Sequence, residues 1–290
     1  MNTQLSDRGR LIISMLIFGT IGLVRRLIPF PSSVIVFARA LIGFLFLLLL
    51  RMLRHERTDR EAVRRNLGKL LLLGAMLAVN WIILFEAYRY TTVAAATMCY
   101  YMAPVIVIVT SPIIFKEKIT LRKGLCALAA VCGMVLVSDV LTDGLHGTKG
   151  LLLGLAAAFL YASIIIVNRT LRDISALDRT IAQFAVASAV MLPYVLLTED
   201  LTALDFTPRI VALLLVLGIV HTGFAYMLYF GSIPRVSAQT AALLSYLDPV
   251  LAVILSVTVL RESMSLPAMV GAAIVIGSML LSEWEPAKRQ

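Results

Sequence analysis

Four ionisable residues lie inside long apolar runs and are the first candidates for chemistry: Arg39, Glu86, His221 and Asp248. An ionisable side chain within a bilayer is costly, so it faces a cavity or a partner and marks a substrate or ion pathway. Arg39 could anchor a substrate carboxylate. Asp248 could bind an ammonium group or carry a proton, because desolvation favours the protonated carboxyl; a hydrogen-bonded structural acid is the alternative. His221 could also titrate, with a packing role as its alternative.

Glu86 is a candidate partner of Arg39. Arg39 and Glu86 lie about six and about four residues from the same ends of their apolar runs, a difference of about 3 Å in depth at 1.5 Å per residue. The two could form a structural ion pair, or act as a substrate anchor and a proton carrier. Arg89, three residues after Glu86 on the same helix face, is a competing partner.

Aromatic and amide side chains in the same runs are candidates for the walls of a cavity. Rings with polar tips suit amphipathic organic solutes. We expect Asn80, Trp81, Tyr101 and Tyr246 to line such a cavity.

Two prolines near the middle of apolar runs predict helix kinks, Pro104 and Pro249. Proline donates no backbone hydrogen bond and clashes with the carbonyl four residues earlier. The carbonyls of Tyr100 and Ser245 are therefore left free, which a bilayer tolerates only where they face protein or a wet cavity. We expect the kinks to face the pathway, with improved helix packing as the alternative.

Catalytic motifs are missing. The sequence contains no HExxH, no GxxxxGK and no GxSxG pattern, and its three cysteines lack the CxxC spacing of zinc or redox sites. We expect neither an enzyme, nor a bound metal, nor a cofactor.

Ten apolar runs must position the candidate residues. Hydrophobic residues make up 60% of the chain and charged residues 15%, which is unusual for a soluble domain. Runs of about 20 residues are long enough to cross a bilayer as helices. The composition predicts an all-α integral membrane protein with spans at 10–28, 33–53, 69–90, 92–115, 121–138, 149–168, 178–197, 209–230, 236–260 and 264–282.

The formal net charge of +9 is distributed as membrane topology requires. Lys and Arg concentrate in the segments that face the cytoplasm when both termini are cytoplasmic, as the positive-inside rule expects. We therefore interpret the charge as topology rather than as a nucleic-acid footprint. The prediction is a multi-pass protein of the cell inner membrane, in contact with lipid.

The second half of the sequence restates the first at an offset of 145 residues. Five spans per repeat is an odd number, so the second repeat enters the membrane from the opposite side. We expect two inverted five-helix repeats, 1–145 and 146–290, in one integrated membrane domain with its site between them. The matching pairs include Tyr101 and Tyr246, Pro104 and Pro249, Val105 and Val250, Ser111 and Ser256, and Glu117 and Glu262.

Glu117 and Glu262 directly follow the fourth and ninth spans. Each precedes a hydroxyl residue by three positions, Thr120 or Ser265, and these hydroxyls are suited to cap the next helix. A carboxylate near the start of a helix is favoured by the helix dipole. We interpret the two glutamates as structural turn residues, with gating as the alternative.

Both repeats resemble a known family. The pattern Thr92-Val-Ala-Ala-Ala … Tyr101-Met-Ala-Pro-Val … Phe115-Lys-Glu-Lys-Ile-Thr, with its second copy Arg235-Val-Ser-Ala-Gln … Tyr246-Leu-Asp-Pro-Val … Leu260-Arg-Glu-Ser-Met-Ser, is similar to the EamA-type repeat of the drug/metabolite transporter superfamily. The resemblance implies ten helices around a central cavity and transport of small metabolites, often export of amino acids, by proton coupling or facilitation. Arg39 also matches the first repeat of that family, but Phe184 stands at its counterpart position in the second.

The leading hypothesis is a secondary carrier that moves a small organic metabolite by alternating access. An amino acid or a derivative fits best, because Arg39 and Asp248 could complement a zwitterion, and the family favours export. The alternatives are an importer or flippase of a larger anion, such as a nucleotide derivative or a lipid-linked sugar, and an intramembrane enzyme or scaffold. The larger anion would favour more basic residues within the spans. The sequence leaves the oligomeric state open and is compatible with a monomer.

Overall fold

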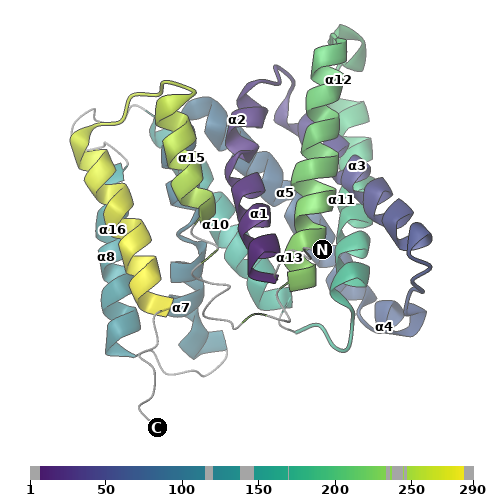
Figure 1. The fold of residues 1–290 in the computed structure, drawn as a ribbon, viewed down its shortest axis with the longest axis horizontal. Coiled ribbons are helices and arrows are strands. Elements are labelled where there is room, and N and C mark those ends of the chain that lie inside the picture. Colours follow the sequence, from purple (N-terminus) through teal and green to yellow (C-terminus); the bar gives the residue numbers. More distant parts are fainter. Residues whose placement is uncertain are drawn as a thin grey trace, which may run out of the picture.

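The computed structural model describes residues 7–114, 120–137, 147–168, 170–232, 236, 244 and 247–283. Every regular element among these residues is a helix, and the helices form one bundle (Figure 1). The all-helical part of the prediction is therefore confirmed. Glu117, Ser245 and Tyr246 lie outside the described residues.

The helices follow one another along the chain in this order. They are α1 (Asp7–Gly19), α2 (Ile21–Arg26), α3 (Ser32–Leu53), α4 (Arg60–Arg65), α5 (Leu67–Tyr90), α6 (Val93–Tyr100), α7 (Ala103–Ile114), α8 (Leu121–Val137), α10 (Thr148–Asn168), α11 (Ala176–Thr198), η1 (Leu201–Ala203), α12 (Pro208–Leu215), η2 (Val216–Phe224), α13 (Ala225–Ser232), α15 (Leu247–Thr258) and α16 (Leu266–Glu283).

Within the described part of the chain, five helical elements are long and apolar enough to cross a membrane: α3, α5, α10, α11 and the continuous stretch Pro208–Tyr229. Each lies in one of the predicted spans, because an apolar run in a bilayer must satisfy its backbone hydrogen bonds internally and so becomes a helix. Shorter apolar helices cover parts of four other predicted spans: Val93–Val107, Gly124–Val137, Leu247–Thr258 and Leu266–Ser278.

Hydroxyl side chains fix the starts of several helices. Thr92, Ser175 and Ser265 each accept a hydrogen bond from the backbone N–H three residues later, at 3.0 or 3.1 Å. Such caps satisfy donors that the first helical turn leaves unpaired. Ser265 thus has the capping geometry that its spacing from Glu262 predicts.

Two of the predicted spans are irregular inside. A turn at Tyr101–Met102 separates α6 from α7, immediately before the proline at position 104. The element that begins with α12 changes into a π-helix, η2, before it continues as α13. Pro249 is buried in the first turn of α15. Irregular backbone within spans is where the pathway of a membrane protein is usually found.

Helices α3 and α11 lie side by side and antiparallel. At one end Ser33, in the first turn of α3, donates a hydrogen bond to Glu199, which follows α11. At the other end Arg51, in the last turn of α3, pairs with Asp178 in the first turn of α11, with 2.5 Å between Nη2 and Oδ1. Each contact joins the start of one helix to the end of the other, so the two helices run in opposite directions.

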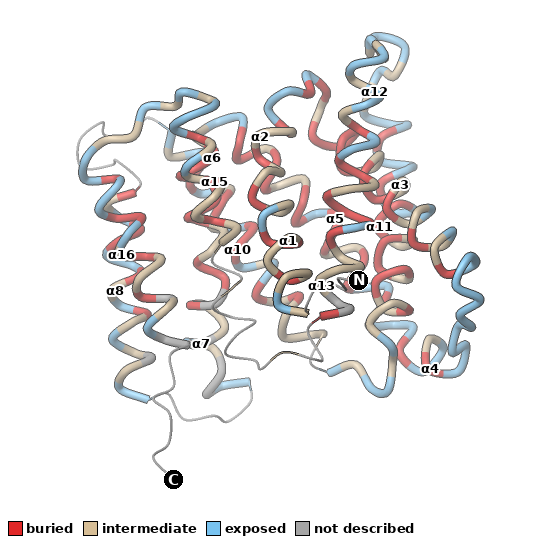
Figure 2. Tube along the Cα trace, in the orientation of Figure 1, coloured by how far each residue is buried: buried red, intermediate tan, exposed pale blue. Residues whose placement is uncertain are grey.

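Helices α8 and α16 form a separate pair at one edge of the bundle, on the left in Figure 1. Gly133 and Gly271 allow this close approach, because a Cβ on Gly271 would lie 2.5 Å from the carbonyl oxygen of Gly133. Their buried residues face each other and α7, while much of their outer surface is exposed (Figure 2). The main core lies elsewhere, between α3, α5, α11 and the helices that contact them.

Candidate functional site

Arg39 lies in the main core, where α3, α5 and η2 meet. Its side chain is only 3% exposed. Nε donates a hydrogen bond to the Thr222 hydroxyl at 3.2 Å. The guanidinium carbon lies 3.9 Å from the centroid of the Trp81 ring and 5.3 Å from that of Phe85. A cation over an aromatic face is favourable, most of all with tryptophan.

Arg39 has no acidic partner within the described residues. None of the ion pairs found there includes it, and neither of its Nη atoms donates a hydrogen bond to another described residue. A buried cation without a counter-charge is costly unless something else supplies one. The outer nitrogens of Arg39 therefore have no hydrogen-bonding partner among the described residues.

Glu86 does not approach Arg39. Its carboxylate pairs instead with Arg89, at 3.1 and 3.3 Å. The two residues are one helical turn apart on α5, so this pair forms without any constraint between helices. Glu86 therefore pairs with Arg89, the competing partner identified in the sequence. A role for Glu86 in the pathway remains a prediction.

An aromatic cluster continues the Arg39 site across the bundle. The Trp81 ring lies 5.7 Å from the ring of Phe184 on α11, and Phe184 lies 5.3 Å from Tyr226 on α13 in an edge-to-face contact. Phe18 on α1 packs against Tyr226 from the other side, at 5.2 Å. Trp81 was predicted to line a cavity, whereas the contribution of Phe184 was not foreseen.

Asp248 and Tyr101, two separately predicted residues, are brought together. The Tyr101 hydroxyl donates a hydrogen bond to Oδ2 of Asp248. Tyr101 occupies the turn between α6 and α7, and Asp248 lies in the first turn of α15. The helix interruption before position 104 thus places Tyr101 next to Asp248 of α15. Both side chains are half-buried.

The arginine and the acid share a set of tyrosines. Tyr88, Tyr100 and Tyr226 each lie within electrostatic reach of both Arg39 and Asp248. Arg39 and Asp248 do not form an ion pair with each other, since that would require an N–O distance of 4 Å or less, and no such contact occurs between them in the described residues. Arg39 and Asp248 therefore flank one group of tyrosines without contacting each other.

Asn80 joins three helices beneath this region. Its amide nitrogen donates to the Ala157 carbonyl of α10 at 2.7 Å, and its amide oxygen accepts from the Tyr100 hydroxyl of α6 at 3.3 Å. Tyr100 in turn stacks on Tyr161, with 5.1 Å between ring centroids. Because Asn80 is fully buried and both ends of its amide are engaged, it positions Tyr100.

His221 lies in the π-helix next to Thr222. Its Nδ1 lies 3.2 Å from the Val216 carbonyl oxygen, and its Nε2 lies 2.8 Å from the Thr20 hydroxyl at the α1–α2 break. A carbonyl only accepts, so Nδ1 carries the ring hydrogen. The Thr20 hydroxyl, which also donates to the Ile17 carbonyl at 2.7 Å, contacts Nε2. His221 therefore connects the π-helix to the first helix of the chain.

The π-helix and its partners were not predicted. Its backbone approaches α3 through glycines, because a Cβ on Gly218 would clash with Ile42 and a Cβ on Gly223 would clash with Phe46. Gly43 makes the reciprocal approach from α3, toward Thr222. These glycines are the signal in the sequence that could have indicated a tight contact at Arg39.

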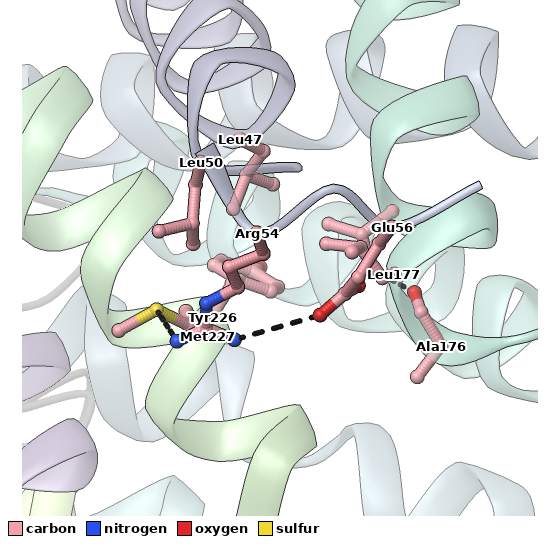
Figure 3. A pocket seen from close by; sticks show the side chains of 9 residues that line it. Leu47, Leu50, Arg54, Glu56, Ala176, Leu177, Tyr226 and Met227 are labelled. Atoms are coloured by element: carbon pink, nitrogen blue, oxygen red, sulfur yellow. Dashed lines mark hydrogen bonds and ion pairs between the residues drawn. The ribbon is translucent and has the colours of Figure 1, made fainter. Parts of the chain in front are cut away.

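A cavity of about 160 Å³ reaches this cluster from the end of the bundle that carries α4 (Figure 3). Tyr226 forms part of its wall and connects it to the aromatic cluster. Arg54 lies 3.6 Å from the Met227 sulfur and 3.9 Å from Glu56. Apolar side chains line most of the remainder: Leu47, Leu50, Ala176 and Leu177.

The described residues contain no group of three or more His, Cys, Asp or Glu side chains that could hold a metal ion. Membrane-length apolar helices with buried ionisable side chains between them are typical of a multi-pass membrane protein.

The comparison with known families agrees. The EamA-like transporter family matches residues 10–139 and 148–284, and the chain belongs to this family, within the drug/metabolite transporter superfamily. The family and the names of its relatives indicate a membrane transporter rather than an enzyme.

Several relatives support this assignment. An uncharacterized transporter, YxxF, of Bacillus subtilis is 25% identical over 94% of this chain and 88% of its own length. An uncharacterized transporter of Archaeoglobus fulgidus is 23% identical over 94% of both chains. Protein PecM of Dickeya dadantii is 24% identical over 74% of this chain and 73% of its own. A solved crystal structure shares the fold, with a TM-score of 0.69, 18% identity and coverage of 95% of both chains.

Proposed function

We propose that this protein is a secondary carrier that moves a small organic solute bearing both a carboxylate and an amine, an amino acid or a derivative, across the cell inner membrane. Export by alternating access, with both termini in the cytoplasm, is the direction we propose. The arginine of the site binds the carboxylate, and the acid binds the amine or a proton.

The observation that carries this proposal is the unpaired charge at each side of one aromatic region. Arg39 has no acid within the described residues, and Asp248 has Tyr101 as its hydrogen-bonding partner there. A zwitterion placed between them would supply the missing counter-charge to both. Tyrosine rings with hydroxyl tips suit the remaining surface of such a solute.

Repeat-related contacts support the inverted arrangement that alternating access requires. Ser33 and Asp178 are 145 residues apart, and each ties the start of its helix to the end of the other. The packing of α5 on α10 has its counterpart in α13 on α1, and that of α7 on α10 has its counterpart in α15 on α1. A two-fold axis in the membrane plane produces such matched pairs.

The experiment is solute flux in proteoliposomes, with a panel of labelled amino acids and derivatives and with and without a pH gradient. Loss of one charge-assisted hydrogen-bonding partner weakens binding by roughly tenfold to a hundredfold, so Arg39→Gln should raise the half-saturating concentration by that factor. Leu45→Ala, an exposed position on the same helix, is the matched control. A folded protein that moves no solute of the panel under either condition contradicts the proposal.

Asp248→Asn separates coupling from binding. The amide keeps a hydrogen-bond acceptor for Tyr101 but cannot exchange a proton, so we expect flux to lose its dependence on pH. Thr258→Ala on the same helix removes a hydroxyl that donates to the Ile254 carbonyl, and it serves as the control. A pH profile of Asp248→Asn identical to that of the wild type would end the proposal of proton coupling.

A further inference from the structure

A second cavity, of about 440 Å³, lies at the junction of α2, α3 and the end of α5. Figure 1 shows this junction at the end of the bundle opposite α4 and the cavity of Figure 3. Three arginines contribute to its wall, Arg25, Arg26 and Arg89, together with Tyr88 and the segment 28–31. We call it the arginine pocket.

Arg25 is a buried cation without an ion-pair partner among the described residues, although Glu86 acts on it from beyond ion-pair distance. It is 5% exposed, and no ion pair within the described residues includes it. Its Nη atoms donate to the Ile28 carbonyl and the Ser32 hydroxyl, both at 3.1 Å, while the buried Nε has no partner. Neutral acceptors hold the side chain in place but leave its charge uncompensated.

The other two arginines are neutralised from outside the pocket. Arg26 pairs with Glu262 at 2.8 Å, and Arg89 pairs with Glu86. Neither Glu262 nor Glu86 contributes to the pocket wall, whereas all three arginines do. Glu262 is also held by the Val93 N–H at 2.8 Å, which fixes it behind the wall. The wall therefore presents positive charge to whatever occupies the pocket.

A layer of two rings separates the pocket from Arg39. The guanidinium carbon of Arg25 lies 5.9 Å from the Phe85 centroid, and that of Arg39 lies 5.3 Å from the same ring. Tyr88, in the pocket wall, stacks on Phe85 at 6.1 Å. Phe85 is fully buried, so it closes the direct route between the two arginines in this conformation.

We propose that the arginine pocket binds the anionic group, a carboxylate or a phosphate, of a small organic solute, and that it is the station next to Arg39 on the transport pathway. This inference rests on the proposed function for its place in the pathway, but the binding itself does not require transport. A volume of about 440 Å³ is suited to a metabolite rather than to a macromolecule.

The test measures anion binding by calorimetry on purified protein that carries Arg39→Gln, so that the central site does not contribute. The probes are glutamate and succinate as carboxylates, inorganic phosphate and glycerol phosphate as phosphates, and sodium chloride at matched ionic strength. We expect one of the two organic anion classes to bind above the chloride background. Preference between the classes identifies the group that the pocket recognises.

Two further substitutions assign the site. Arg89→Gln removes a half-exposed arginine of the wall, and Arg25→Lys keeps the buried charge but removes the planar fork that binds oxyanions. Each should weaken binding about tenfold. Arg60→Gln on α4, an exposed arginine at the opposite end, is the control and should leave binding unchanged.

Two results would overturn the inference: no binding above chloride, or equal losses in Arg89→Gln and Arg60→Gln. Proteoliposome flux of the wild-type protein distinguishes this failure from failure of the proposed function. Anion binding without flux contradicts the proposed carrier function. Flux that is unaffected by Arg89→Gln, together with absent anion binding, contradicts only the proposed arginine pocket.

Discussion

The ion pair between Arg51 and Asp178 offers a direct measurement of how α3 and α11 are held together. It is the most buried ion pair in the described part of the chain, with side chains 10% and 5% exposed. Arg51 also donates to Thr58 at 2.5 Å, and Asp178 accepts from Ser175 at 2.9 Å. We predict that Asp178→Leu alone is strongly destabilising, because it leaves the arginine charge buried without a carboxylate.

The size of the effect follows from this burial. Removing one partner of a buried ion pair costs about 3–5 kcal/mol of unfolding free energy. Thr58 still accepts from Arg51 in the variant, so we expect the lower value, about 3 kcal/mol. At about 2–4 °C per kcal/mol for a chain of this size, the midpoint of unfolding should fall by about 6–12 °C. In the double variant Arg51→Leu, Asp178→Leu no charge remains, so most of the loss should be recovered.

The assay is thermal unfolding of the detergent-purified protein, with wild type, both single variants and the double variant compared as a cycle. The exposed pair of Arg65 and Asp173, with side chains 47% and 82% exposed, is the control, since such pairs contribute at most about 1 kcal/mol. A double variant whose loss equals the sum of the two single losses would refute the reasoning, because the two side chains would then not interact.

Two further outcomes follow from local packing. Gly271→Ala should lower the midpoint of thermal unfolding, because its Cβ would lie 2.5 Å from the Gly133 carbonyl oxygen. Gly277→Ala on the same helix is the control: its Cβ meets nothing within 4 Å, so it should raise the midpoint slightly through helix propensity. Similar shifts for the two variants would contradict this. His221→Ala should lower the free energy of unfolding by about 1–3 kcal/mol, because it leaves the Val216 carbonyl without its side-chain donor and removes the contact with Thr20. Chemical unfolding in detergent measures this loss. An unchanged midpoint would show that these contacts do not stabilise the protein.

The helices of this protein could be predicted because a bilayer leaves the backbone few alternatives. An apolar run of about 20 residues becomes a helix whatever its neighbours do. The interruption at Tyr101–Met102 was also foreseeable, since proline at position 104 cannot donate to the carbonyl four residues earlier. The π-helix of Val216–Phe224 was not. Apart from His221 its residues are apolar or small, so no periodicity distinguishes it, and its glycines pack tightly against α3.

Side-chain partners were harder to predict than helices, because a contact between two helices depends on the depth of each residue and also on the rotation of each helix about its axis. Arg39 and Glu86 were placed at similar depths, but a sequence does not give the rotation of one helix relative to another. Glu86 found a partner on its own helix, where the separation of three residues fixes both coordinates. Tyr101 and Asp248 were each expected in the pathway, and their contact depends on how α15 lies against α6, which only the structure gives.

The difference between the two repeats at Arg39 has a physical explanation. Positions 39 and 184 correspond through the offset of 145, as do Trp81 and Tyr226. In the structure these four residues form one cluster, since Trp81 contacts both Arg39 and Phe184, and Phe184 contacts Tyr226. Such a meeting of equivalent positions is expected where two inverted repeats approach the axis between them.

An arginine at both positions would place two like charges around one buried indole, where the low dielectric makes their repulsion large. Only one of the two equivalent positions can therefore carry the cation, and an apolar ring such as Phe184 fills the other at no electrostatic cost. A solute with one carboxylate needs one guanidinium group. The same asymmetry recurs at Asp248, whose counterpart is Ala103, so the two repeats together carry one basic and one acidic residue at these positions, as the proposed binding of a zwitterion requires.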